Sequence, residues 1–260
     1  TAPSLELKSR FMTRDRQVNL SEKPNQPVKE DRAVLDYFRK PSKLIRTDGI
    51  VGTTSRGITM GMKSDIDRAR AIYEWIVDNT FRDPKVKGCG IGDISTMLQT
   101  GYLGGKCADL NALYVGLGRA AGLPARDVYG IRCANSSEFK SLGKADDITR
   151  AQHCRAEVFL SGYGWVPVDP ADVRKVVLEE NLPGQPLPLD DPKVKKARAK
   201  LFGAWEMNWL AYNYAHDVKL PNSNGPELGF LMYPQVEEAN GRRDSLDPDN
   251  FKYTITAKEI

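Results

Sequence analysis

Three residues of this sequence have the side-chain types, and the order along the chain, that suit acyl transfer through a covalent intermediate. Cys107 follows a Gly-Gly-Lys segment at 104–106 and opens an apolar run over 108–121, which predicts a helix that begins at the thiol. The unpaired N–H groups of a helix N-terminus favour negative charge, so they lower the pKa of the thiol and raise the fraction of thiolate. His153, one of only two histidines, and Asp169 follow in that order. Together the three predict a thiol nucleophile with a histidine base and an orienting carboxylate.

Each of these residues has a physical role in such a site. Cys107 attacks an acyl carbon, and His153 holds the thiol proton and later protonates the leaving amine. Asp169 fixes the tautomer of the imidazole and stabilises its positive charge. The backbone N–H of Cys107 is one expected donor to the oxyanion. A second donor is expected from the preceding loop, where Tyr102 and Gln99 are the candidates.

The strands that carry His153 and Asp169 must pair in a particular register. Residues 153–160 and 165–169 alternate as two strands around a turn that contains two glycines. For His153 and Asp169 to share a face, the numbers of paired residues must have an even sum. We therefore predict a three-residue turn, a five-residue turn or a bulge near Gly162 and Gly164.

Two helices have clear sequence signals. Ser64, followed by early acids, predicts a capped helix that continues through Asn79. In the segment after Cys107, leucines at 110, 113 and 117 form one apolar stripe, which places the thiol on the packed face. Gly122 and the proline at 124 predict where that helix ends.

The remaining segments give a coarser outline of an α+β protein. We expect strands over 4–20, with Leu5 and Leu7 inward, and over 127–133, 205–218 and 251–260, and irregular backbone over 48–61. Short helices are expected over 28–38 and 94–99, and a proline-rich loop over 181–192. No composition break divides the chain, so we expect one domain over residues 1–260 with a mainly antiparallel sheet.

Composition excludes several classes of protein. A net charge of +4 is too small to indicate nucleic-acid binding, and the basic cluster that follows Asp191 and Pro192 is typical of a solvated helix face. The absence of an apolar run of 18 residues predicts no membrane span. Four cysteines and two histidines suit neither a disulfide framework nor a zinc site, so no metal or cofactor is expected. Cys133 and Cys154 lie on neighbouring strands and are expected either as a disulfide or as two buried thiols.

Three blocks of this sequence resemble the transglutaminase-like core. They are Gly-Lys-Cys-Ala-Asp at 105–109, continued by Arg-Ala-Ala-Gly-Leu-Pro-Ala-Arg at 119–126, then His-Cys-Arg-Ala-Glu-Val at 153–158 and Gly-Trp-Val-Pro-Val-Asp-Pro at 164–170. The resemblance spans residues 66–172, flanked by N-terminal and C-terminal extensions. It implies a papain-like fold in which the cysteine helix packs on an antiparallel sheet, with a triad of Cys107, His153 and Asp169.

The resemblance also carries expectations about activity and location. Bacterial members are described as cysteine proteases and many are exported, so a periplasmic location is expected, with a cytoplasmic one left open. The chain departs from the family at Arg155, where an aromatic residue is frequent, and we expect this arginine to change the polarity of the cleft wall. No acidic cluster resembles a calcium loop, so calcium-activated transamidation is not predicted.

Three functions are consistent with the sequence. The first is a hydrolase that cleaves a peptide or amide bond through a thioester on Cys107. The second is a transglutaminase that passes the same acyl group to an amine. The third is a silent binding domain, which the intact triad disfavours. A peptide or protein is the expected partner in each case, and the oligomeric state is left open.

Overall fold

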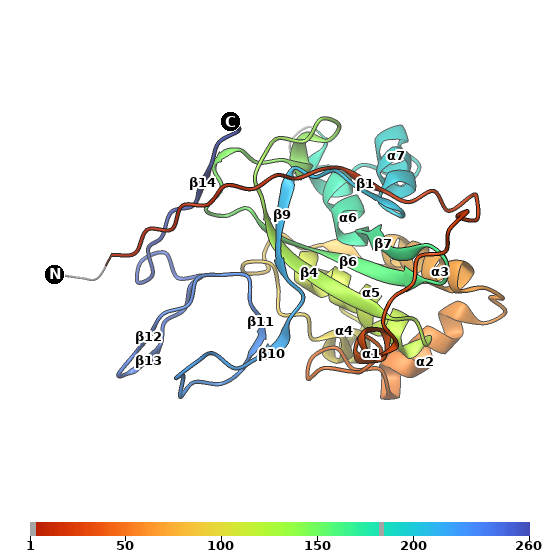
Figure 1. Cartoon of the computed structure of the whole chain (residues 1–260), viewed down its shortest axis with the longest axis horizontal. Coiled ribbons are helices and arrows are strands. Elements are labelled where there is room, and N and C mark those ends of the chain that lie inside the picture. The colour runs from red at the N-terminus through yellow and green to blue at the C-terminus, as the bar shows by residue number, and fades with distance from the viewer. Residues whose placement is uncertain (1–3, 182–184) are drawn as a thin grey trace.

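A four-stranded antiparallel sheet forms the centre of the computed structural model, which describes residues 4–181 and 185–260 (Figure 1). Its strands lie in the order β7-β6-β4-β9, so the longest two are in the middle. The four strands are β4 (Ala125–Arg132), β6 (Gln152–Leu160), β7 (Gly164–Val168) and β9 (Trp209–Asn213). All three pairings are antiparallel. The α+β class predicted from the sequence is therefore confirmed.

Helix α5 packs against one face of this sheet and carries Cys107 as its first residue (Figure 1). Leu110, Leu113 and Leu117 of α5 join Cys154 and Ala156 of β6 in the main hydrophobic core. The other helices surround α5 and the sheet. The helices of the described residues are α1 (Arg32–Tyr37), α2 (Gly49–Thr59), α3 (Asp65–Asn79), α4 (Ile94–Thr100), α5 (Cys107–Ala120), α6 (Pro170–Glu179) and α7 (Pro192–Lys200).

The helix ends follow the local signals of the sequence. Ser64 and Asp67 form a capping box at the start of α3, with both reciprocal hydrogen bonds present. Gly122 takes a φ of +85° just past α5, and the next N–H donates back to the Gly118 carbonyl. Asp191 caps α7 by accepting from the N–H of Lys193. These three predictions are confirmed because each end depends on neighbours in sequence.

The β6–β7 hairpin has the register that the triad requires. Leu160 pairs with Gly164 across a three-residue turn, and Ala156 pairs with Val168, so paired numbers have an even sum. Gly162 and Gly164 both take positive φ values, of +89° and +81°, which suit glycine at this turn. Continuing the register places Asp169 across from residue 155, diagonal to His153 and on the same face.

Several two-stranded pairs surround the sheet, and they show where the sequence outline was wrong. They are β1 (Arg16–Gln17) with β8 (Ala204–Trp205), β2 (Phe81–Arg82) with β3 (Gly104–Gly105), β5 (Asp146–Asp147) with β14 (Thr256–Ala257), β10 (His216–Val218) with β11 (Leu228–Phe230), and β12 (Glu237–Glu238) with β13 (Gly241–Arg242). A 3-10 turn spans Lys140–Leu142. The strand expected over 205–218 is divided among β8, β9 and β10. Between β8 and β9, the Asn208 carbonyl accepts the N–H groups of residues 133 and 134, which interrupts the strand there.

Three other predictions are corrected by tertiary contacts. Leu5 and Leu7 are exposed, at 96% and 88%, and the segment 4–20 contains only β1. Residues 49–59 form helix α2 instead of irregular backbone, because Val51 and Ser55 are buried and the Ser55 hydroxyl donates to the Leu117 carbonyl at 2.7 Å. The segment 251–260 pairs only at β14. Within the described residues, no helix has both the length and the apolar character that a bilayer crossing needs. Pro183 of the expected proline-rich loop lies outside the described residues.

Candidate active site

A cavity of about 800 Å³ opens at the N-terminus of α5, and both Cys107 and His153 line it. The loop over 87–89 and the start of β6 form two of its sides. Residues 245–254 and Tyr233 form another side, so the C-terminal extension completes the cleft. The sequence outline missed this contribution, because it treated 251–260 as a strand that closes the sheet.

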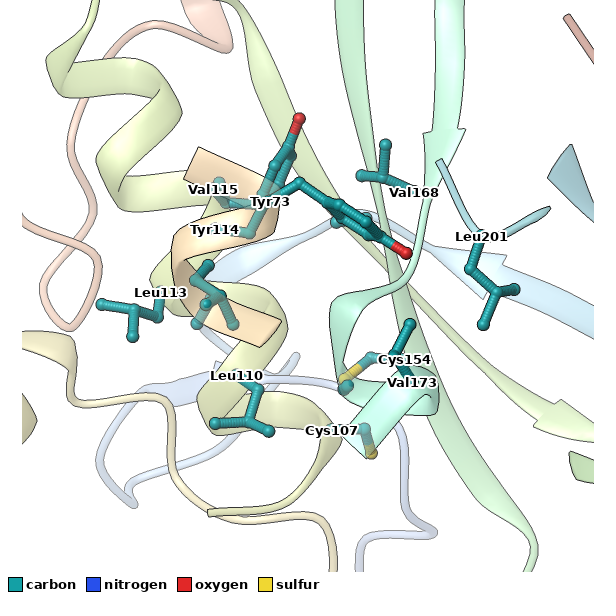
Figure 2. Close-up of a cluster of buried hydrophobic side chains, with 14 of the residues drawn as sticks. Tyr73, Cys107, Leu110, Leu113, Tyr114, Val115, Cys154, Val168, Val173 and Leu201 are labelled. Carbon is teal, nitrogen blue, oxygen red and sulfur yellow. The ribbon is translucent and has the colours of Figure 1, made fainter. Parts of the chain in front are cut away.

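Cys107 is 4% exposed and occupies the first position of α5, at the end of the helix's buried side chains (Figure 2). Its neighbours include the thiols of Cys154 and Cys89, and the His153 ring. Hydrogen bonds from Cys154 and Cys89, with His153 adding attraction, outweigh burial and hold the pKa of Cys107 well below the ordinary thiol value. The environment therefore favours the thiolate that the sequence predicted.

Two carboxylates face the same nitrogen of the His153 ring. Nε2 lies 2.8 Å from Asp169 Oδ2 and 3.3 Å from Asp172 Oδ2. Burial and Arg132 lower the pKa of His153, but Asp172, Asp169 and Cys107 outweigh them and raise it to about 9. This shift favours the imidazolium form of His153, opposite a thiol whose pKa is lowered. Sequence reasoning identified Asp169 and missed Asp172, which lies one helical turn beyond it.

Asp169 is held by several donors in addition to the imidazole. Its Oδ1 accepts from the backbone N–H of Asp172 at 3.0 Å, as the N-cap of α6, and from the Asn111 amide at 3.2 Å. Asp172 Oδ1 accepts from Arg132 at 2.6 Å. Burial and the Asp172 charge raise the pKa of Asp169, whereas Arg132 and His153 hold the pKa of Asp172 well below its ordinary value despite burial. The two carboxylates of Asp169 and Asp172 together stabilise the imidazolium form of His153.

Arg155 lies beneath the triad and not on the cleft wall where we expected it. Its side chain is 2% exposed, and its Nε is 3.6 Å from Asp169 Oδ2. The guanidinium carbon lies 4.9 Å from the Trp209 ring centre and 5.4 Å from that of Trp205, and Nη1 donates to the Glu206 carbonyl. Trp209 also donates its indole N–H to the His153 carbonyl at 2.8 Å. Arg155 therefore interacts with the Asp169 carboxylate and does not line the cavity.

Asp109 fastens the loop that carries Cys89 to the start of α5. Its Oδ1 accepts from the N–H groups of Ile91 and Gly92 at 2.9 Å each, and its Oδ2 accepts from the N–H of Lys106 at 2.9 Å. Sequence reasoning missed this contact. The position of Asp109 three residues after a possible cap was the signal for this role.

The two residues expected to supply a second oxyanion donor have other contacts. The Tyr102 hydroxyl donates to Asp83 at 2.8 Å, and its side chain is 54% exposed. Gln99 is an exposed residue of α4. Neither residue lines the cavity, whereas Tyr233 does, and its buried hydroxyl lies beside the Cys89 thiol. The Cys107 N–H is at the first position of α5, as expected for the other donor.

All four cysteines are free thiols in the structure, so Cys133 and Cys154 form no disulfide. Cys154 is buried in the main core, whereas Cys133 packs beside Ile131 and Ile148 in a separate cluster. Of the two alternatives left open, the structure has the one with separate thiols.

One group of described side chains is close enough to share a metal ion, namely His153, Asp169 and Asp172. Arg132 donates to one of these carboxylates and Arg155 lies beside the other. These two guanidinium groups already offset the charge of the carboxylates and would repel a divalent ion more strongly than a singly charged imidazolium, so this cluster suits a charged imidazole better than a metal.

Residues 52–170 match the family model of the transglutaminase-like superfamily. This match contains α5, β6 and β7, and with them all three proposed triad residues. This segment is a transglutaminase-like core. A curated relative from Haemophilus influenzae, named only as an uncharacterized protein, is 36% identical over 248 residues. That alignment covers 91% of this chain and 66% of the relative, so the chain spans less than two thirds of the relative's length.

Solved structures of the superfamily are more distant. The periplasmic domain of TgpA from Pseudomonas aeruginosa is 14% identical, with a TM-score of 0.44, over 64% of this chain and 53% of its own. A candidate cysteine protease from Cytophaga hutchinsonii is 20% identical, with a TM-score of 0.42, over 71% of this chain and 54% of its own.

Proposed function

We propose that this transglutaminase-like protein is a cysteine-dependent acyl-transfer enzyme that hydrolyses a peptide or amide bond through a thioester on Cys107. The observation that carries the proposal is a pair of opposite pKa shifts at two residues that line one cavity. The pKa of Cys107 is lowered, and that of His153 is raised to about 9 by the carboxylates behind it. An ion pair of thiolate and imidazolium, ready before substrate arrives, is the activated form of a cysteine nucleophile.

The geometry supports the following roles for individual atoms in the proposed reaction. Because Asp169 engages Nε2 of His153, Nδ1 is the ring nitrogen left for the chemistry. The thiolate adds to the acyl carbon, and the oxyanion forms beside the Cys107 N–H. The C–N bond then breaks as imidazolium gives its proton to the leaving amine, which leaves a thioester. Neutral His153 next removes a proton from water, hydroxide attacks the thioester, and the acid leaves as the thiolate and the imidazolium are restored.

Alkylation with iodoacetamide across pH, mapped by mass spectrometry, tests the nucleophile. Cys107 should react fastest of the four thiols in mildly acid solution, where Cys89, Cys133 and Cys154 are protonated, since each of these has a raised pKa. Cys133→Ala is the matched control and should leave the profile unchanged. If Cys107 reacts no faster than Cys133 under those conditions, an activated thiol is ruled out.

Product analysis separates hydrolysis from amine transfer. A peptide pool is offered with and without a labelled primary amine, and Cys107→Ala provides the blank. Hydrolysis predicts new peptide termini and no label in products, whereas labelled peptides would assign the transglutaminase reaction instead. The exported location expected from the family resemblance stays a prediction, which fractionation of cells can test.

A further inference from the structure

The charge of the cleft is unlike that of the rest of the molecule. Eight of the side chains that line it are Lys or Arg, and among the described residues that line it there is no Asp or Glu. The whole chain has 38 basic and 34 acidic residues, so acids nearly balance bases elsewhere. A one-sided lining of this kind attracts anions into a concave site.

Three of these cations lie at the mouth of the cleft and are not neutralised by a partner. Lys144 and Arg150 come from the segment before β6, and Lys252 comes from the C-terminal extension. All three are exposed, and no described carboxylate lies within ion-pair distance of any of them. Lys144 and Arg150 help to lower the pKa of Asp147, which is not among the residues that line the cleft.

The cations deeper in the cleft are also incompletely paired. Arg82 and Lys175 share a single carboxylate, that of Glu179, at 2.6 and 3.6 Å. Lys106 adjoins the nucleophile, and its ammonium donates only to the Val86 carbonyl, at 2.6 Å. One acid therefore serves two of these inner cations, and Lys106 has no described carboxylate within ion-pair distance. A bound carboxylate would supply the missing charge where these groups are partly desolvated.

We propose that this cleft selects acyl donors whose chain carries carboxylates beside the scissile amide, in other words acidic peptides. The inference rests on the proposed function, because only a Cys107 acyl enzyme needs an acyl donor here. Lys144, Arg150 and Lys252 determine the specificity at the mouth, and Lys106 and Lys175 receive a carboxylate nearer the thiol. The acidic groups Asp169 and Asp172 lie behind His153 and are matched by Arg132 and Arg155, so they do not cancel this preference.

A pair of alkylating agents measures the charge at the thiol without the natural substrate. The readout is the ratio of Cys107 alkylation by iodoacetate, an anion, to that by neutral iodoacetamide, in the full chain at about 0.01 M salt. The test variant is Lys144→Gln/Arg150→Gln/Lys252→Gln, and the control is Lys29→Gln/Lys63→Gln/Lys195→Gln, which removes the same charge from exposed positions outside the cleft.

The expected size of the effect follows from Coulomb's law. A charge about 10 Å away in water changes the approach of an anion roughly twofold, so three charges change it about eightfold. The ratio should fall by about that factor in the cleft variant and stay constant in the control. At about 1 M salt the difference should disappear. Equal ratios in the two variants at low salt would overturn the proposal.

Peptide competition then tests the substrate class. A peptide with four Glu residues around a central Gln should protect Cys107 from iodoacetamide at lower concentration than the same peptide with Gln at every position, and the cleft variant should lose the difference. Equal protection would refute the preference for acidic peptides, and stronger protection by an anionic oligosaccharide would assign the cleft to a glycan. A Cys107 that is unreactive in wild type would instead refute the proposed function, so the two failures are distinguishable.

Discussion

Replacing Asp169 by Asn removes the charge behind His153 and keeps the shape of the side chain. Asn is as good an N-cap as Asp, so α6 should retain its first turn. The amide can still accept from the Asp172 N–H, the bond that Asp169 Oδ1 makes at 3.0 Å. We therefore expect the variant to fold, and thermal unfolding should show a change of about 1 kcal/mol or less from the cap itself.

The effect on the imidazole can be worked out from the structure. The pKa of His153 rises from 6.5 to about 9, and 1.36 kcal/mol corresponds to one unit, so the net stabilisation of imidazolium is about 3.4 kcal/mol. Asp172 and Asp169 are the two largest attractions that raise this pKa, and they lie 3.3 and 2.8 Å from Nε2, so we assign about half of the net effect to Asp169. Its loss should cost about 1.7 kcal/mol, or roughly a twentyfold fall in the thiolate–imidazolium population.

The assay is the rate of Cys107 alkylation by iodoacetamide as a function of pH. In the variant the inflection should move upward, with a rate about twentyfold lower in mildly acid solution and a recovery toward the wild-type rate in alkali. Peptide turnover should fall further, by about a thousandfold or more, because the amide also disturbs the tautomer. A folded Asp169→Asn variant with an unchanged alkylation profile would refute this account of the site.

The same charges predict a link between pH and stability. The folded pKa of His153 is above its unfolded value, so its stabilisation is complete below pH 6.5 and is lost as pH rises through about 9. That loss should shrink in Asp169→Asn, and chemical denaturation at a series of pH values measures it.

Three further predictions concern other parts of the chain. Burial raises the pKa of Asp127 to about 7, and neither of its carboxylate oxygens has a hydrogen bond within the described residues, so Asp127→Asn should stabilise the fold above pH 7 by up to about 4 kcal/mol. This gain should fade as pH falls toward 3.8, and a gain that is the same at every pH in denaturant titrations would contradict the prediction. Asp109→Ala removes three hydrogen bonds from backbone N–H groups of the Cys89 loop and the start of α5. Hydrogen exchange at Ile91 and Gly92 should therefore accelerate, and Cys107 alkylation should slow by about tenfold. Unchanged exchange would show that contacts other than Asp109 hold the loop. Ser64→Ala removes the capping box of α3 and should lower the free energy of unfolding by about 1 kcal/mol without changing the alkylation rate of Cys107. An altered alkylation rate would contradict the separation of this cap from the site.

The parts of the site that depend on neighbouring residues were predictable from sequence. The even-sum hairpin register followed from strand alternation once His153 and Asp169 were required to share a face, and the cap of α3 followed from Ser64 and Asp67. Cys107 at the first position of α5 followed from an apolar stripe that starts at the thiol. In each case the signal and its consequence lie within a few residues, so long-range packing has little influence on the outcome.

The parts that depend on long-range contacts were not predictable. The burial of α2 depends on α5, which lies far along the chain, and the small and polar composition of α2 concealed its helical conformation. Arginine is usually exposed, yet Arg155 is enclosed by Trp205 and Trp209, which come from a distant segment of the chain. The basic cleft gathers lysines and arginines from six separated segments, whereas acids nearly balance bases when both are counted along the whole chain. The prediction of one domain over residues 1–260 stays a prediction.

The aromatic enclosure of Arg155 gives the molecule an optical reporter of its own. Of four tryptophans, Trp205 and Trp209 lie against the guanidinium beneath the triad, and Trp209 holds the carbonyl of His153. Indole emission is sensitive to nearby charge and to the orientation of its polar neighbours. Protonation of His153, or acylation of the thiol opposite it, should therefore alter intrinsic fluorescence. Stopped-flow mixing could follow formation and decay of the acyl enzyme without a labelled substrate, with a Trp209→Phe variant to identify the source of the signal.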